Sequence, residues 1–272
     1  MQFLPSALLA PYIKNYTVVT IGKDIDNEVF YPSGYVDLVL NISAGNAATI
    51  INGRKKDTPD IELLGHLTLP TRLTVKEGTT VLIARIYPFA AALFFPYQLS
   101  EFTNYATDLY DVRLEESREL YQRVMEADQV ARQISVLEDY FLRLLAKNEK
   151  QLKKVTLVQQ LSRQVLTGLS QPDLSSLSRD TGISGRYIQK LYLSHIGLSP
   201  AAFAGIVRFN RGLQQVLHSP ASLTAIAYEC GYYDQAHFIR EFRKFTGITP
   251  SEARRSLTRN GKEYQQAVNI GF

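Results

Sequence analysis

A pattern of apolar residues and glycines occurs twice in the second half of this 272-residue chain. Its first part is Leu174, Leu177 and Gly182, which recur 49 residues later as Leu223, Ile226 and Gly231. Its second part is Ile188, Tyr192 and Gly197, which recur 50 residues later as Phe238, Phe242 and Gly247. Spacings of three and four place side chains on one helix face, and glycine readily takes the left-handed conformation that ends a helix. Each copy therefore predicts two short helices joined by a glycine turn, the plan of a helix-turn-helix unit whose second helix enters the DNA major groove.

The second copy, from Ser222 to Pro250, is the clearer one. Asp234 is placed to cap its second helix, and Gly231 to end its first. Along the second helix the spacing predicts one buried face and several exposed polar positions. The buried set is Phe238, Phe242 and Phe245, and the exposed set is Gln235, His237, Arg240 and Lys244. The stretch then predicts the start of a third helix at Thr249, Pro250 and Ser251, continuing through Arg255.

The stretch from Pro200 to Leu217 connects the two units and predicts a single long helix. At about 1.5 Å per residue it is on the order of 25 to 30 Å long, close to the roughly 34 Å between successive major-groove faces. A rigid connection of this length can present both second helices to one side of the DNA. The spacing thus turns two separate motifs into one geometric prediction.

Residues 153 to 257 resemble the DNA-binding domain of AraC/XylS-type transcriptional regulators. The resemblance rests on Leu174 to Ser184, Tyr187 to Tyr192 and Gly197 to Pro200, and above all on Ala227 to Gly231, Asp234 to Phe238, Arg240, Phe242, Arg243 and Phe245 to Ser251. Tyr232 departs from the family, which usually has Phe there. Residues 1 to 150 resemble more distantly the small cupin-related β domain attached to a subset of these regulators. The resemblance implies a sequence-specific transcriptional regulator that binds double-stranded DNA, with RNA polymerase as a partner if it is an activator.

The resemblance also implies which residues contact DNA. In the first unit Arg186, Gln189 and Lys190 face the groove, and in the second unit Gln235, His237 and Arg240 do so. Arg and Lys can donate to guanine, and Gln can pair with adenine. The candidate phosphate contacts are Tyr187, Arg208, Arg211, Arg243 and Lys244, with internal ion pairs as the alternative for the four cations. Asp234 is expected to be a helix cap, and Glu241 to pair with a nearby cation.

The distribution of charge agrees with a DNA-binding second half. Residues 1–150 hold 15 Lys and Arg against 19 Asp and Glu, a net charge of −4, whereas residues 151–272 hold 15 against 7, a net charge of +8. These two ranges are the two domains that we expect. The basic range is the candidate binder of a polyanion.

The first domain predicts an antiparallel β barrel or sandwich followed by helices, so that the whole chain is of the α+β class. Runs rich in β-branched and aromatic residues predict strands at 16–21, 35–42, 47–51, 61–68, 72–76 and 81–87. The turn-forming residues Ser43 to Asn46 predict a hairpin between the second and third of these runs. Residues 77–79 join the last two.

An aromatic segment, Pro88 to Asn104, follows the last run and is expected to close one end of the barrel. Phe89, Phe94, Phe95 and Tyr97 could line an apolar ligand pocket for a small-molecule effector. The alternative, that they complete the core, is favoured because aromatics dominate the core area of small β domains.

Helical periodicity from Val112 to Lys147 predicts two helices with a break near Ala127 and Asp128. A surplus apolar face on them could form a homodimer seam, and packing back onto the β domain is an equal alternative. Asn148 to Lys154 is polar and lysine-rich, which favours a linker.

Several classes of function are disfavoured by what the chain contains. His66 is the one histidine of four in the β domain, too few for a cupin-type metal centre, and no nucleophile elbow, P-loop or dinucleotide motif is present. We therefore expect no enzyme, metal or cofactor. Cys230 is the single cysteine, and we expect a packed thiol in a reducing compartment.

Neither a secretory signal nor a membrane span is predicted, so a cytoplasmic, nucleoid-associated protein is expected. The alternative function is a ligand-binding protein whose helical half is a protein-interaction module.

Overall fold

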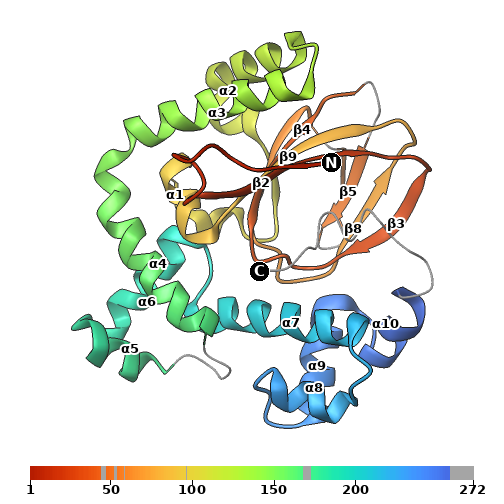
Figure 1. Cartoon of the computed structure of the whole chain (residues 1–272), viewed down its shortest axis with the longest axis vertical. Helices are drawn as coiled ribbons and strands as arrows, with labels where there is room; N and C mark the ends of the chain where they lie inside the picture. The colour runs from red at the N-terminus through yellow and green to blue at the C-terminus, as the bar shows by residue number, and fades with distance from the viewer. Residues whose placement is uncertain (44–46, 52–53, 58, 96, 168–172, 258–272) are drawn as a thin grey trace.

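The computed structural model describes the chain except for residues 44–46, 52–53, 58, 96, 168–172 and 258–272. Figure 1 shows a β sandwich with helices along its upper and left sides, and a second group of helices below it. The α+β class and its order along the chain are as predicted.

The sandwich consists of two antiparallel sheets. The larger has the order β1 (Gln2–Phe3), β2 (Ile13–Thr20), β9 (Thr80–Ile86), β4 (Val36–Asn41), β7 (Ile61–Leu64) and β10 (Ala106–Asp108). The smaller has the order β3 (Ile25–Phe30), β8 (Thr71–Val75), β5 (Ala47–Ile51) and β6 (Arg54–Asp57). The sheets form a sandwich and not a closed barrel. All six predicted strands are present, whereas the short β1 and β10 and the polar β3 and β6 were missed because they lack a run of β-branched residues.

The predicted hairpin after β4 is wrong. β4 pairs with β7 and β9 in the larger sheet, whereas β5 pairs with β6 and β8 in the smaller one. The chain therefore crosses between the sheets at this point, as it does at five other connections between described strands, including the one between β8 and β9. Turn residues mark where a strand ends but not which sheet the next strand joins, and β4, buried on both faces, takes neighbours that are distant in sequence.

Helices from the first 150 residues cover the larger sheet. They are the short η1 (Pro88–Ala90), α1 (Ala91–Phe94) and η2 (Leu99–Phe102), followed by α2 (Leu109–Glu126) and α3 (Val130–Lys147). The break between α2 and α3 lies where the sequence predicted it. Leu120 and Val124 of α2 and Leu137 and Phe141 of α3 are at most 1% exposed, so these faces pack back onto their own domain.

The second group of helices begins directly after α3. A three-residue turn, η3 (Glu149–Gln151), and the start of the next helix occupy the stretch that was predicted as a linker. The helices that follow are α4 (Leu152–Thr167), α5 (Leu174–Thr181), α6 (Gly185–His195), α7 (Pro200–His218), α8 (Leu223–Glu229), α9 (Gln235–Thr246) and α10 (Pro250–Leu257). Each helix predicted in this half is present. No described helix is long and apolar enough to cross a membrane.

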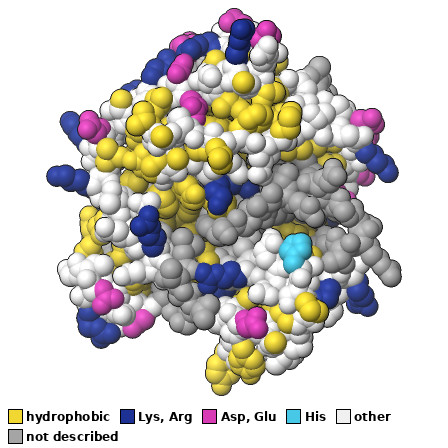
Figure 2. Space-filling view, viewed as in Figure 1, with side chains coloured by type: hydrophobic (Ala, Val, Ile, Leu, Met, Phe, Trp, Pro, Cys, Tyr) yellow, Lys and Arg dark blue, Asp and Glu magenta, His cyan; other side chains and the backbone are white. Residues whose placement is uncertain are grey.

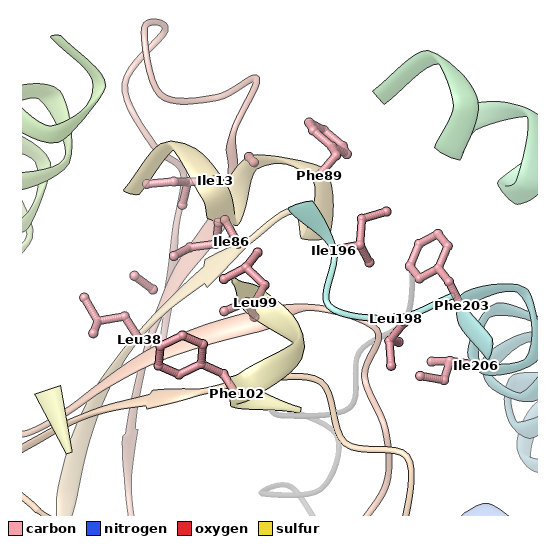
Figure 3. Close-up of a cluster of buried hydrophobic side chains, with 14 of the residues drawn as sticks. Ile13, Leu38, Ile86, Phe89, Leu99, Phe102, Ile196, Leu198, Phe203 and Ile206 are labelled. Carbon is pink, nitrogen blue, oxygen red and sulfur yellow. The ribbon is translucent and has the colours of Figure 1, made fainter. Parts of the chain in front are cut away.

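One continuous apolar core joins the two domains. Figure 3 shows it running from Ile86 in the sheet, past Phe89 and Leu99, to Ile196 and Phe203 in the helical half. The aromatic segment expected to close a barrel instead forms this interface.

Three of the four aromatic residues suggested for a ligand pocket complete the core instead, which is the alternative that the sequence favoured. Phe94 and Phe95 are fully buried and Phe89 is 7% exposed, stacked on Tyr87 with ring centroids 5.5 Å apart. Tyr97 is 38% exposed and lies beside Phe102, with centroids 6.1 Å apart. The domain interface was not predicted from the sequence, because a run of aromatic residues is equally compatible with a core, a pocket or a domain contact.

Candidate nucleic-acid interface

The first helix-turn-helix unit is α5, a turn and α6. The Asp173 carboxylate caps α5 by accepting from the Ser175 amide at 2.9 Å, and Gly182 ends it with φ of 68°. The Ser184 hydroxyl accepts from the Tyr187 amide at 3.3 Å and so caps α6. Four residues of α6 are buried: Ile188, Leu191, Tyr192 and His195. Local capping and the helical spacing of these residues are sufficient to set the turn.

The opposite face of α6 carries the residues predicted to meet DNA. Arg186, Tyr187, Gln189 and Lys190 are all exposed. They lie within the first two turns of the helix, the part of a recognition helix that reaches base edges. Tyr187 is 42% exposed, which suits a phosphate or sugar contact next to the charged side chains.

The second unit, α8 to α9, repeats this construction. Ser222 caps α8 through the Ala225 amide at 3.1 Å, and Gly231 takes φ of 77° in the turn. The Asp234 carboxylate accepts from the His237 amide at 2.6 Å, which confirms its role as a cap. The expected core face is confirmed by three side chains that are at most 4% exposed: Phe238, Phe242 and Phe245.

The residues of α9 that were predicted to face DNA differ in their exposure and in their contacts with the protein. Arg240 is exposed, whereas Gln235 and His237 are half-buried. The Gln235 side-chain oxygen accepts from the Thr224 hydroxyl at 2.6 Å, which leaves its amide N–H groups to donate. The His237 ring packs edge-on against Tyr232, with centroids 5.3 Å apart. Pairing with adenine uses both the amide donor and the oxygen acceptor of Gln235. Because a carboxamide oxygen can accept two hydrogen bonds, the Thr224 contact restricts how the side chain turns toward a base and does not block that pairing.

Arg208, predicted as a phosphate contact, is inside the protein. It is 3% exposed, and its Nη2 atom lies 3.4 Å from a carboxylate oxygen of Glu241, which confirms the expected pairing of Glu241 with a cation. Its guanidinium carbon is 5.6 Å from the centre of the Tyr232 ring. The internal ion pair, the alternative for this residue, is what the structure has. Periodicity along α7 could not reveal it, because the partner comes from α9.

The other candidate phosphate contacts remain accessible. Arg243 and Lys244 are exposed at the end of α9, and Arg211 is half-buried on α7. The Lys244 ammonium rests 5.6 Å from the centre of the Phe245 ring. Figure 2 shows Lys and Arg side chains over both the upper part and the helical lower part of this face.

Two exposed tyrosines were not predicted as site residues. Tyr233, in the turn before α9, is 86% exposed, and Tyr228 at the end of α8 is 61% exposed. The dipeptide Tyr232–Tyr233 was the available signal, because in a turn of two aromatics before a buried helix only one ring can enter the core. Tyr232 is that ring, at 3% exposed.

The connecting helix α7 holds the units apart. Its 19 residues correspond to about 28 Å. Most of its length is buried, from Phe203 to Leu213, and Figure 1 shows it running between the α6 end and the α9 end of the helical domain. The length is therefore close to the roughly 34 Å between successive major-groove faces.

Two chemically reactive side chains are buried. Burial raises the pKa of the Cys230 thiol to about 11, so the thiol is neutral near pH 7, as a packed residue should be. Burial lowers the pKa of His66 to about 4, so its imidazole is neutral too. Within the described part of the chain no group of His, Cys, Asp and Glu is arranged to hold a metal ion.

Comparison with known proteins agrees with this geometry. Residues 177–256 match a family described as a helix-turn-helix domain, and residues 1–108 match a domain of unknown function. An uncharacterised helix-turn-helix transcriptional regulator of Haemophilus influenzae is 33% identical over 86 residues, 32% of this chain and 27% of the relative. The transcriptional regulator ExsA of Pseudomonas aeruginosa is 33% identical over 101 residues, 37% of this chain and 34% of the relative. The chain thus spans only between about a quarter and a third of the length of these relatives.

Two solved structures show similarity over different extents. A probable AraC family transcriptional regulator from Rhodopseudomonas palustris is 33% identical and covers 36% of this chain and 94% of its own, with a TM-score of 0.33. ToxT from Vibrio cholerae is 16% identical and covers 89% of this chain and 97% of its own, with a TM-score of 0.44.

The fold and the exposed faces of α6 and α9 define a DNA-binding domain built from two helix-turn-helix units. This domain is of the AraC type, as its residues predicted.

Proposed function

We propose that the protein is a sequence-specific DNA-binding transcriptional regulator, with α6 and α9 in successive major grooves. The observation that carries this proposal is the pairing of two capped units with exposed polar faces at the two ends of one buried helix, α7. The similarity to transcriptional regulators in residues 177–256 supports it.

Base contacts are assigned to the side chains that the faces expose. In the first unit these are Arg186, Gln189 and Lys190. In the second they are Arg240, which can donate to guanine, and His237 and Gln235, whose positions are fixed by Tyr232 and Thr224. Tyr233 joins this set, because an exposed ring directly before the α9 cap lies where a recognition helix enters the groove.

Phosphate contacts are assigned to Tyr187, Arg211, Arg243 and Lys244. These groups position the domain without reading sequence, and each cation that neutralises a phosphate steepens the salt dependence of binding. Arg208 is excluded from this set by its burial.

Residues 1–150 supply the regulatory input in this proposal. A small-molecule effector or a second copy of the chain would act there, and a difference in its affinity for two arrangements of the domains would shift DNA binding. RNA polymerase is the partner if the regulator activates. The proposal includes no enzymatic activity and places the protein in the cytoplasm, at the nucleoid.

Selection from a random double-stranded DNA library tests the function. The expected product is a site with two blocks of preferred bases centred about one helical turn, or about 10 base pairs, apart. Binding of the selected site should weaken steeply with salt. The rival function, a ligand-binding protein with a helical protein-interaction module, would give no enriched sequence and a flat salt response.

A further inference from the structure

The second helix of each helix-turn-helix unit ends near a glycine with a positive φ, but the two glycines have different surroundings. Gly197 follows α6 with φ of 89°, and its counterpart Gly247 follows α9 with φ of 78°. A Cβ atom added at Gly247 would have no other atom within 4 Å. A Cβ atom at Gly197 would lie 2.7 Å from the backbone oxygen of Leu99 in η2. Only the first of these two glycines is packed against the amino-terminal domain.

A hydrogen bond reinforces this contact. The Thr103 hydroxyl, just after η2, donates to the backbone carbonyl of Gly197 at 2.9 Å. Leu198, the next residue, is 5% exposed, and Figure 3 shows it beside Phe203 and Ile206 of α7 on the side that faces η2. The end of α6 is thus held to η2 by backbone contact, a hydrogen bond and apolar packing.

The other side of η2 touches the sheet just as closely. A Cβ atom at Gly65, directly after β7, would lie 2.1 Å from the backbone oxygen of Phe102. The Gly65 amide also donates to the carbonyl of Tyr105 at 3.3 Å, and the Asn104 amide donates to the carbonyl of His66 at 2.8 Å. Backbone packed on backbone cannot absorb a shift by changing a rotamer, so a displacement at this end of β7 must move η2.

The contacts of the amino-terminal domain with α7 have a different effect. The Asn210 side chain donates to the carbonyl of Pro32 at 3.0 Å, and Tyr31 packs edge-on against Phe209 with centroids 6.3 Å apart. Phe209 in turn touches Phe245 of α9, with centroids 4.9 Å apart. Because α7 packs against both units, a displacement passed through these contacts would move the two units together. A displacement passed through the η2 contact would move the first unit.

We propose that η2 is the element through which the amino-terminal domain regulates DNA binding, by displacing the first recognition helix, α6, relative to the second, α9. The proposal rests on the proposed DNA-binding function. A change at the sheet edge near Gly65 would reach α6 through Leu99, Phe102 and Thr103, and would alter the register of one recognition helix in its groove while the other keeps its place on α7.

The two glycines provide a matched experiment in the full chain. Gly197→Ala and Gly247→Ala create the same backbone strain at a positive φ, but only the first pushes on η2. Thr103→Val removes the hydrogen bond and keeps the side-chain shape. Hydrogen exchange without DNA should show amides of residues 99–103 and of the end of α6 exchanging about tenfold faster in Gly197→Ala and Thr103→Val, and unchanged in Gly247→Ala.

Footprinting on the selected two-block site then reports on binding. The block assigned to the first unit, identified as the one weakened by Gln189→Ala, should change its affinity about fivefold or more in Gly197→Ala and Thr103→Val, while the other block changes little. Equal changes in both blocks, or unaltered exchange of residues 99–103 in Thr103→Val, would overturn the proposal. A chain that shows the exchange pattern but selects no DNA sequence would instead refute the DNA-binding function.

Discussion

The guanidinium of Arg208 lies 3.4 Å from the carboxylate of Glu241, inside the contact between α7 and α9. Both side chains come from the helical half, and Arg208 is 4% exposed in its side chain against 18% for Glu241. The pair ties the second recognition helix to the helix that spaces the two units.

Arg208→Met should therefore lower the stability of the protein without removing a phosphate contact to DNA. Removing one partner of a buried pair leaves the other charge uncompensated and should cost about 3 kcal/mol of unfolding free energy, measured by urea denaturation. Glu229→Gln, a loss of one exposed charge in the same unit, is the control and should change stability little. Under conditions where Arg208→Met remains folded, the salt dependence of DNA binding should keep its slope. A slope reduced by about 1 would instead show that Arg208 contacts a phosphate.

Replacement of single exposed residues should separate base reading from phosphate contact. Gln189→Ala and Arg240→Ala should each weaken binding of the selected site by about 1 to 3 kcal/mol and relax the base preference at one position. Lys244→Ala should weaken all sequences alike and lower the salt slope by about 1. Gel-shift titrations at several salt concentrations measure both quantities. Unchanged binding by both alanine variants in α6 and α9 would contradict the groove assignment.

Thr224→Val should change what Gln235 reads. The Thr224 hydroxyl occupies the Gln235 oxygen at 2.6 Å, so the amide of the parent protein is available as a donor. Valine keeps the shape and removes a hydrogen bond that orients the carboxamide and competes for its oxygen, which should strengthen the two-point pairing with adenine. Repeating the selection with this variant should raise the preference for adenine in the block bound by α9 only. The same base profile in parent and variant would show that Gln235 does not read that position.

Acid should weaken the protein through His66. Its folded-state pKa of about 4 lies below the ordinary value of 6.5 because burial disfavours the imidazolium ion. The unfolded chain therefore takes up a proton first, so this contribution to stability is complete above pH 6.5 and falls as the pH drops toward 4. The full loss is about 3 kcal/mol, from 1.36 kcal/mol per pKa unit.

His66→Leu should remove this part of the acid sensitivity. Urea denaturation at pH 7 and pH 4.5 gives the difference for parent and variant, and the exposed His218→Gln serves as the control that should behave like the parent. Because the His66 ring packs against Phe203 of α7, with centroids 6.3 Å apart, its acid response should coincide with loss of the domain contact, seen as faster hydrogen exchange in α7. If His66→Leu and the parent lost stability equally between pH 7 and pH 4.5, His66 would not be a source of the acid sensitivity.

The sequence by itself determined the two helix-turn-helix units. Ser184 and Asp234 each cap the helix that follows by accepting from an amide three residues further on, and Gly231 takes a positive φ in the turn after α8. Phe238 and Phe242 share a buried face because they are four positions apart. Such features depend on neighbours within one or two helical turns, so the order of residues is enough to specify them.

Only the tertiary structure decided which residues and strands that are distant in the sequence come into contact. It placed Arg208 beside Glu241, sent β4 and β5 into different sheets, and made the aromatic segment a domain interface. It also set Gly197 against η2 and left Gly247 open, although both close the same motif. These outcomes depend on elements far apart in the chain, whose approach is governed by packing of the whole core, and no local spacing records it.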